Sequence, residues 1–184
     1  MSLTLIKETG AGLVDANSYA DVADGDAYHA GHLYASAWTG ATADQKAVAL
    51  VMASRLLDAE YQFGGFKSAD SQALQWPRYR CPDPDRDETL RVDRLTVVEN
   101  WLPENLVPKA VVQSACELAR ELLIADRTAA PAGEGLKYYN NAGVQTGYDK
   151  TDKRPVIPAV VQAMLAKYGA LHQAKSGSVK LVRV

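Results

Sequence analysis

The chain has few of the residues that build metal centres, disulfide frameworks or membrane spans. It contains two cysteines and three histidines among 184 residues, too few for a disulfide framework or a zinc motif. Its longest apolar runs, residues 47–53 and 156–161, are far shorter than the roughly 18 to 20 residues that a membrane helix needs. The N-terminus lacks the charged and apolar segments of a signal peptide. We therefore expect a protein that works inside a cell and has no membrane partner.

The individual histidines and cysteines lead to the same expectation. His29 and His32 are three residues apart and close to Asp26, but no fourth ligand follows at a compatible spacing, so a divalent-metal site is not predicted. Cys116 lies on the apolar face of a predicted helix, where a cysteine is typically a small core residue. The sequence therefore predicts neither a metal ion nor another cofactor.

The motifs of catalysis are also lacking. Gly10-Ala-Gly12 has neither the third glycine nor the preceding buried strand of a dinucleotide site, and Gly133-Glu-Gly135 is followed by a polar hairpin. Glu117 and Glu121 are a carboxylate pair, but both fall on the polar side of a helix, where Arg120 can pair with them as surface charges. The sequence contains no Gly-x-Ser-x-Gly and no His-Glu-x-x-His. We therefore expect that the chain is not an enzyme.

Charge is unevenly distributed, although the formal net charge is only −2. Residues 1–66 hold three Lys or Arg against eight Asp or Glu, residues 67–149 hold ten against thirteen, and residues 150–184 hold seven against one. The acidic balance argues against a general nucleic-acid coat protein, because non-specific binding is driven by phosphate neutralisation. An acidic front and a basic tail suit subunits that pack head to tail, and ordinary solvated faces are the alternative interpretation.

Four stretches have the apolar spacing and the start signals of helices. They span residues 18–31, 42–63, 108–126 and 158–172. The first is expected to begin at Ser18, with Asp21 completing a capping box, and the second begins with a capping box of Thr42 and Gln45. Proline is tolerated in the first turn of a helix, as at the start of the third and fourth stretches. The sequence therefore predicts a mainly α fold, a small bundle of about four helices.

Between the helices the sequence predicts loops and a little sheet. Residues 66–105 hold four prolines and a run of mixed charge, so we expect a long irregular loop with one short strand at 91–98, and a loop of this length is a candidate contact surface. Residues 136–148 indicate a β-hairpin that turns at 141–143. We expect one domain over residues 1–184, in which 1–14 and 173–184 are extended arms that alternate in part like strands.

Aromatic and basic residues occur together in several places, as in proteins that bind single-stranded nucleic acid. The candidate interaction residues are Trp76, Arg78, Arg80, Tyr138, Tyr139, Lys153 and Arg154. A simpler interpretation is that Trp76 and Phe66 anchor the long loop to the helices, with Arg78 and Arg80 paired to the aspartates that follow. We favour this structural interpretation for the loop residues.

Several sequence elements, in this order, resemble a phage and prophage family. They are Asp15-Ala-Asn-Ser-Tyr19, Trp38, Lys46-Ala-Val-Ala-Leu50 with Arg55 and Asp58, Trp76-Pro-Arg78, Val107-Pro108 and Pro158-Ala-Val160. Members of this family are often labelled DnaT-like single-stranded-DNA-binding proteins. The resemblance covers the chain from about residue 15 to residue 172.

That family is similar in turn to the head-tail connector, or adaptor, proteins of tailed bacteriophages. This resemblance implies a homo-oligomeric ring, typically a dodecamer, that lies beneath the portal protein and is capped by a stopper or tail-completion protein. It places the chain in the virion neck after assembly in the bacterial host cytoplasm, with DNA passing through the bore in weak contact. It implies no catalytic residue.

The expected function is therefore a structural, non-enzymatic subunit of a head-tail connector that joins portal to tail. The alternative is a DnaT-like single-stranded-DNA-binding protein of a phage or prophage. The acidic balance and the lack of a dense basic groove weaken that alternative.

Overall fold

The computed structural model describes residues 3–85, 101–129, 138–141, 144–147 and 155–172. These residues form five α-helices and three two-stranded antiparallel sheets. The helices are α1 (Val22–Ala30), α2 (Ser36–Thr39), α3 (Ala43–Glu60), α4 (Lys109–Ile124) and α5 (Ala159–Leu165). The paired strands are β1 (Tyr61–Phe63) with β6 (Gly169–Leu171), β2 (Phe66–Lys67) with β3 (Arg78–Tyr79), and β4 (Tyr138–Asn141) with β5 (Val144–Gly147).

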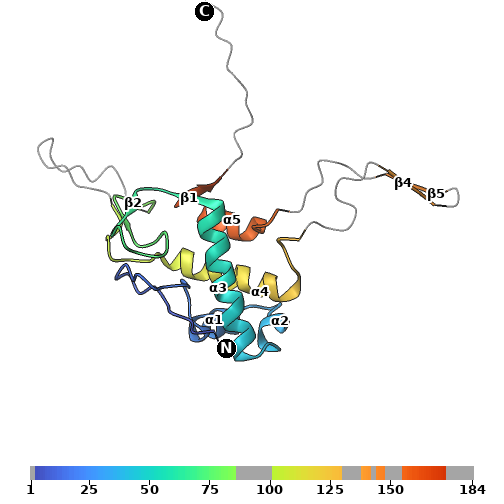
Figure 1. The fold of residues 1–184 in the computed structure, drawn as a ribbon, viewed down its shortest axis with the longest axis horizontal. Coiled ribbons are helices and arrows are strands. Elements are labelled where there is room, and N and C mark those ends of the chain that lie inside the picture. The colour runs from blue at the N-terminus through green and yellow to red at the C-terminus, as the bar shows by residue number, and fades with distance from the viewer. Residues whose placement is uncertain (1–2, 86–100, 130–137, 142–143, 148–154, 173–184) are drawn as a thin grey trace, which may run out of the picture.

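Helices α3 and α4 form the centre of the fold. Figure 1 shows α3 crossing α4, with α1 and α2 near one end of α3 and α5 near the other. Leu50 and Leu57 of α3 and Val111 and Leu118 of α4 are each 0% exposed, and burying one such side chain contributes roughly 1.5 to 3 kcal/mol. Cys116 is a core residue, as predicted. The predicted mainly α fold is confirmed at the level of helices with small sheets.

The two central helices begin where their local signals predict. The side chain of Thr42 accepts a hydrogen bond from the Gln45 N–H at 3.3 Å, and the Gln45 side chain accepts one from the Thr42 N–H at 2.9 Å. This reciprocal capping box satisfies two backbone donors that the first turn leaves without partners. Pro108 precedes α4 with a φ of −57°, a value already suited to a helix start.

The first helix begins three residues later than its sequence predicts. Its N-cap is Asp21, whose carboxylate accepts from the Asp24 N–H at 2.8 Å, while Asp24 accepts from the Asp21 N–H at 2.9 Å. Ser18 is fully buried and is held by an isolated parallel bridge to Lys7. That bridge is all that forms of a strand over residues 3–8. The non-local pairing of Ser18 therefore overrides its local capping signal.

The last helix is shorter than predicted. It ends at Leu165 instead of continuing to about His172, because residues 169–171 pair as β6 with β1. The His172 N–H extends this pairing by donating to the Glu60 carbonyl at 2.7 Å. At Gly169 a Cβ atom would lie 2.6 Å from the Gln62 carbonyl oxygen, so the close approach of the two strands requires glycine.

The long loop and the hairpin mostly follow their predictions. The segment 66–105 is irregular apart from β2 and β3 in the part that the structure describes, and the strand expected at 91–98 lies outside the described residues. The predicted hairpin is confirmed by β4 and β5, which pair from Tyr138 opposite Gly147 to Asn141 opposite Val144. The turn residues 142–143 and the tail 173–184 also lie outside the described part. Of the helices that are described, none is long and apolar enough to cross a membrane.

Candidate nucleic-acid interface

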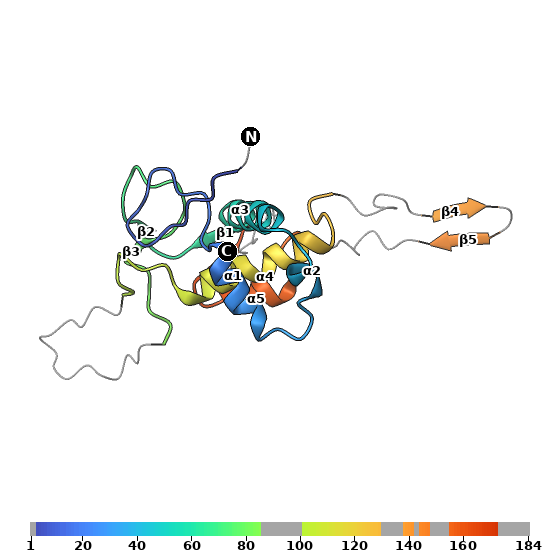
Figure 2. The same cartoon turned by 90° about the horizontal axis from the view of Figure 1, so that it is seen from below.

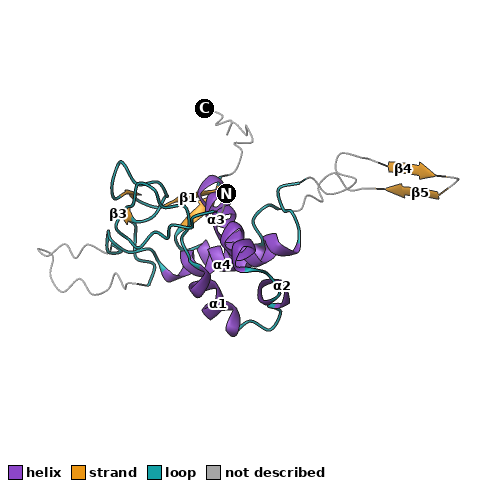
Figure 3. Cartoon of the chain, turned by 60° about the horizontal axis from the view of Figure 1, so that its bottom comes forward, coloured by secondary structure: helices purple, strands orange, loops and turns teal. Residues whose placement is uncertain are grey.

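Trp76 anchors the loop after β1 against the helices. It is 0% exposed, and its ring lies edge-to-face with the rings of Phe63 and Tyr168 at centroid distances of 5.7 and 6.2 Å. Such aromatic pairs contribute about 0.5 to 1.5 kcal/mol beyond their burial. Figure 3 shows the loops around β3 gathered on one side of the helices. Trp76 is therefore a core residue, as the structural interpretation predicts, and it cannot stack on a nucleobase.

Arg78 is held by structural contacts as well, which leave little of its side chain accessible for the predicted interaction. Its guanidinium donates to the carbonyl oxygens of Gly64 and Gly65 at 2.6 Å each. It also donates to the Gln75 carbonyl at 3.0 Å and to the Gln75 side chain at 2.9 Å. Arg78 is 7% exposed, and desolvation by burial lowers its pKa. Arg78 does not pair with Asp83 or Asp85, the aspartates of this loop that the structure describes, because these carbonyl groups occupy its donors.

Phe66, Tyr79 and Arg80 form an exposed surface that we call the β2–β3 face. Phe66 lies directly opposite Tyr79 in the antiparallel pair, so the two side chains project from the same side of the strands. Phe66 is 68% exposed and Tyr79 is 43% exposed. The Arg80 guanidinium lies 5.1 Å from the centroid of the Tyr79 ring, which is cation–π range. The predicted anchoring role of Phe66 is therefore wrong, because the structure leaves it in solvent.

The backbone around this face adopts two unusual conformations. Gly65 has a φ of 71°, and a Cβ there would lie 2.4 Å from the Tyr79 carbonyl oxygen, so only glycine fits the turn before β2. Arg80 has a φ of 53°, a region that residues other than glycine adopt rarely. Arg80 makes no ion pair with any residue that the structure describes, so its predicted pairing with the aspartates is also wrong.

Two further residues belong to the backbone around the β2–β3 face, although Lys67 projects from the opposite side of β2 to Phe66. Trp101 is 37% exposed and bridges antiparallel to Pro82, three residues after Tyr79. Lys67 follows Phe66, is exposed, and donates from Nζ to the Gln72 carbonyl at 3.2 Å. Sequence reasoning missed Trp101, although an aromatic residue at the end of the long loop was the available signal.

The other predicted interaction residues are not brought to this face in the described part of the chain. Tyr138 and Tyr139 are in β4, opposite Gly147 and Thr146 of β5. Figure 2 shows β4 and β5 on the opposite side of the helices from β2 and β3. Lys153 and Arg154 lie outside the described residues. Of the predicted set, Arg80 is the residue that lies exposed beside aromatic side chains.

The carboxylates and histidines of the described residues do not gather into a metal site. No group of three or more His, Cys, Asp or Glu side chains there could hold a metal ion. Glu117 pairs with Arg120 at 2.6 Å, as predicted, but it is 2% exposed, so its predicted place on the surface is wrong. His32 Nε2 lies 3.6 Å from the same carboxylate. These contacts hold the loop after α1 against α4.

A comparison with protein-family models gives one assignment. The model described as "Putative DnaT-like ssDNA binding protein" matches residues 3–184, nearly the whole chain. The chain belongs to this family. No curated protein and no solved structure matches it. The DnaT-like resemblance is thereby confirmed, and the description of the DnaT-like family names single-stranded DNA, not a head-tail connector.

The β2–β3 face of this DnaT-like chain has the chemistry of a stacking surface. Two exposed rings project from one side of a strand pair, and a cation lies over one of them. Aromatic rings accept the face of any base, and a guanidinium can contact both a ring and a phosphate. Buried contacts of Trp76 and Arg78 hold the backbone beneath this face.

Proposed function

We propose that this DnaT-like chain binds single-stranded DNA through the β2–β3 face. The observation that carries the proposal is the pairing of two exposed aromatic residues, Phe66 and Tyr79, with the guanidinium of Arg80 over the Tyr79 ring. Stacking of one base on an aromatic side chain contributes about 1 to 3 kcal/mol and tolerates any base. Arg80 then supplies a phosphate contact, and Trp101 extends the stacking surface.

The buried contacts beneath the face support this proposal. Trp76 and Arg78 tie β3 to the turn at residues 64–65 and to the helical core. A binding surface that is already ordered loses less conformational entropy when the ligand binds. A flexible strand can therefore lie across two fixed rings at a modest entropic cost.

The test is a fluorescence-anisotropy titration of a labelled oligo-dT strand. For the double variant F66A/Y79A we expect Kd to rise about 30-fold or more, since two stacking contacts contribute at least about 2 kcal/mol. Tyr34 is a matched control, because it is 72% exposed on the loop after α1, and Y34A should bind like the wild type. Equal affinities of F66A/Y79A and Y34A, with both variants folded by circular dichroism, would contradict the proposal.

A head-tail connector subunit is the second proposal, and the β4–β5 hairpin favours it. Within the described residues, β4 and β5 pair only with each other, and Figure 1 draws them apart from the helices. Each strand keeps an unpaired edge, to which a strand of a neighbouring subunit can add. In this proposal the chain is a non-enzymatic ring subunit between the portal and the stopper protein, and DNA passes through the bore.

The connector proposal is tested by light scattering of the protein alone and with its portal. A connector should either form a particle of several 19.9-kDa chains alone or add the mass of several such chains to the portal particle. A chain that ignores the portal and stays a monomer would contradict it. Because this measurement contains no free DNA strand, its result is independent of the anisotropy titration.

A further inference from the structure

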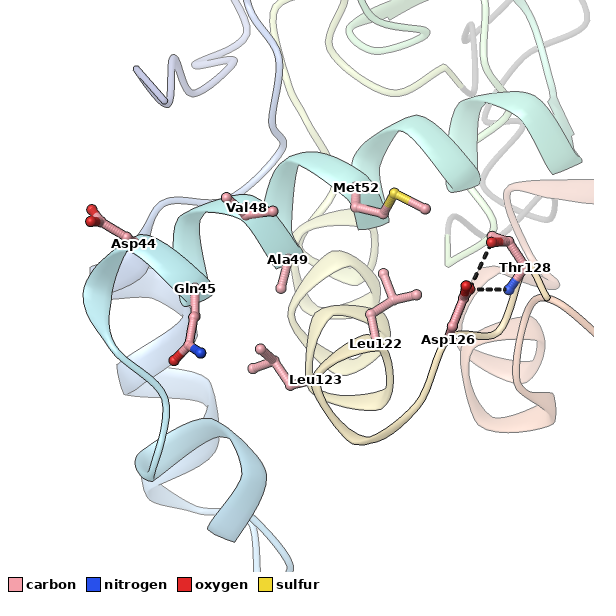
Figure 4. A pocket seen from close by; sticks show the side chains of 9 residues that line it. All are labelled: Asp44, Gln45, Val48, Ala49, Met52, Leu122, Leu123, Asp126 and Thr128. Atoms are coloured by element: carbon pink, nitrogen blue, oxygen red, sulfur yellow. Dashed lines mark hydrogen bonds between the residues drawn. The ribbon is translucent and has the colours of Figure 1, made fainter. Parts of the chain in front are cut away.

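An apolar groove lies between α3 and the C-terminal end of α4. Its volume is about 470 Å³. Figure 4 shows Val48, Ala49 and Met52 along α3, with Leu122 and Leu123 of α4 across from them. Val48 is 53% exposed, and Met52, Leu122 and Leu123 are partly exposed. Neighbouring apolar side chains left in solvent mark a surface that another protein segment can cover.

The two ends of the groove are acidic. Asp44 lies at one end, in the first turn of α3, and Asp126 lies at the other end, after α4 (Figure 4). Both are exposed. The Asp126 carboxylate accepts hydrogen bonds from Thr128, and neither aspartate forms an ion pair with a described residue. An apolar floor with a negative charge at each end fits a segment that is apolar and positively charged.

The C-terminal tail of the chain has this composition. Residues 178–184 read Ser-Val-Lys-Leu-Val-Arg-Val, so four apolar side chains accompany Lys180 and Arg183 without an acidic residue. These residues lie outside the described part of the structure. The tail also ends the basic segment 150–184, whereas the α3 side of the groove belongs to the acidic segment 1–66.

The place where the tail leaves the fold favours a neighbouring copy as its partner. The His172 N–H donates to the Glu60 carbonyl at the C-terminal end of α3. The groove lies along Asp44 to Met52, in the N-terminal half of the same helix. Asp44 is sixteen residues before Glu60, about 24 Å along a helix. A tail that emerges at one end and a groove that opens toward the other are the two halves of a head-to-tail contact.

We propose that residues 178–184 of one copy dock in the α3–α4 groove of a second copy. Val179, Leu181 and Val182 supply apolar side chains for the floor, and Lys180 and Arg183 pair with the aspartates at its ends. Each copy then offers one tail and one groove, so the contact repeats from copy to copy and closes into a ring if the rotation permits. This inference depends on neither proposed function.

A complementation experiment tests the proposal. One variant is V48D, which places a charge on the exposed floor, and the other ends at Gly177. The wild type should gain mass with concentration in sedimentation velocity at low salt, whereas each variant alone should stay a monomer. In an equimolar mixture the V48D tail meets the intact groove of the truncated chain, so pairs should form and growth should stop at two copies.

Charge reversal gives a second test that does not alter the apolar floor. D44K/D126K changes two exposed residues. With its fold checked by circular dichroism, it should fail to self-associate, and mixing it with K180E/R183E should restore association. The proposal is overturned if the wild type is a monomer, whether its tail is free or lies in its own groove. It is also overturned if the variants associate like the wild type.

Discussion

Asp58 is a buried carboxyl group that couples the stability of the fold to pH. It accepts a hydrogen bond from the Tyr19 hydroxyl and another from the Gln75 N–H at 2.9 Å. Burial raises its pKa to about 6, against the opposing effect of these hydrogen bonds. As pH falls, Asp58 of the folded chain therefore takes up a proton near pH 6. In the unfolded chain the same carboxyl group takes up its proton only near pH 3.8, the ordinary pKa of an aspartate. Above pH 6 the fold must carry a desolvated negative charge.

The first prediction concerns this carboxyl group. Because the pKa of Asp58 is higher in the folded state, protonation of Asp58 stabilises the fold. This contribution is fully present below the pKa of the unfolded state and is lost as pH rises through the pKa of the folded state. A shift of about two units corresponds to roughly 2 to 3 kcal/mol in the free energy of unfolding. Urea unfolding of the wild type and of D58N, measured below pH 4 and above pH 7, checks it. The wild type should lose stability relative to D58N as pH rises, and parallel pH profiles would refute the assignment.

Gly25 is the residue through which helices α1 and α2 contact each other. A Cβ at this position would lie 2.2 Å from Cζ2 of Trp38. Trp38 is 1% exposed, and its indole N–H donates to Asp26 at 2.8 Å. The ring of Trp38 therefore cannot retreat without losing both its burial and this hydrogen bond. Glycine has a low helix propensity and therefore destabilises α1, but the packing of Trp38 from α2 leaves no room for a larger residue at position 25.

The second prediction follows from this contact between the two helices. G25A should lower the free energy of unfolding by about 1 to 3 kcal/mol, although alanine is favoured over glycine in a helix by up to about 1 kcal/mol. Gly31 is the matched control, because the nearest heavy atom to a Cβ there is 4.0 Å away. G31A should therefore unfold at nearly the wild-type temperature. Equal melting temperatures of G25A and G31A would show that Trp38 does not constrain this position.

The elements that could be predicted from the sequence are those whose ends carry local signals. The capping box of Thr42 and the proline before α4 define their helices without help from distant residues. Ser18 and the end of α5 could not be predicted, because each is decided by pairing with a segment far away in the chain. Gly25 is a similar case, since the reason for it lies thirteen residues later, at Trp38.

The candidate site was predictable in composition but not in detail. Phe66 and Trp76 are both aromatic, and Arg78 and Arg80 are both basic, so the sequence alone does not tell which member of each pair is buried. The pairing of β2 with β3 and the turn at Gly65 decide it, and they expose Phe66 and Arg80. Arg78 and Arg80 have the same local composition, so the sequence predicts an interaction role for both, and the fold leaves only Arg80 of this pair in solvent.

At the scale of the whole molecule, the charge distribution limits how the chain can hold DNA. The net charge is −2, and the basic residues are concentrated in residues 150–184. Among the residues that the structure describes, Arg80 and Lys67 are the exposed cations at and beside the β2–β3 face. Binding through this face must therefore depend more on stacking than on phosphate neutralisation, which gives it a weak dependence on salt.

The last prediction is the size of that salt dependence. Each phosphate neutralised on a single strand contributes about 0.7 to the slope of log affinity against log salt, so two cations give about 1.4, and a fourfold rise in salt weakens binding about 7-fold. If all seven basic residues of 150–184 took part instead, the slope would be about 5 and the loss about 900-fold. Oligo-dT titrations at several salt concentrations, with the full chain and with one ending at His172, separate the cases. A shallow slope shared by both chains supports the β2–β3 face. A steep slope that becomes shallow on truncation places the phosphate contacts in the tail, and a steep slope that survives truncation places them elsewhere in the chain, outside the β2–β3 face.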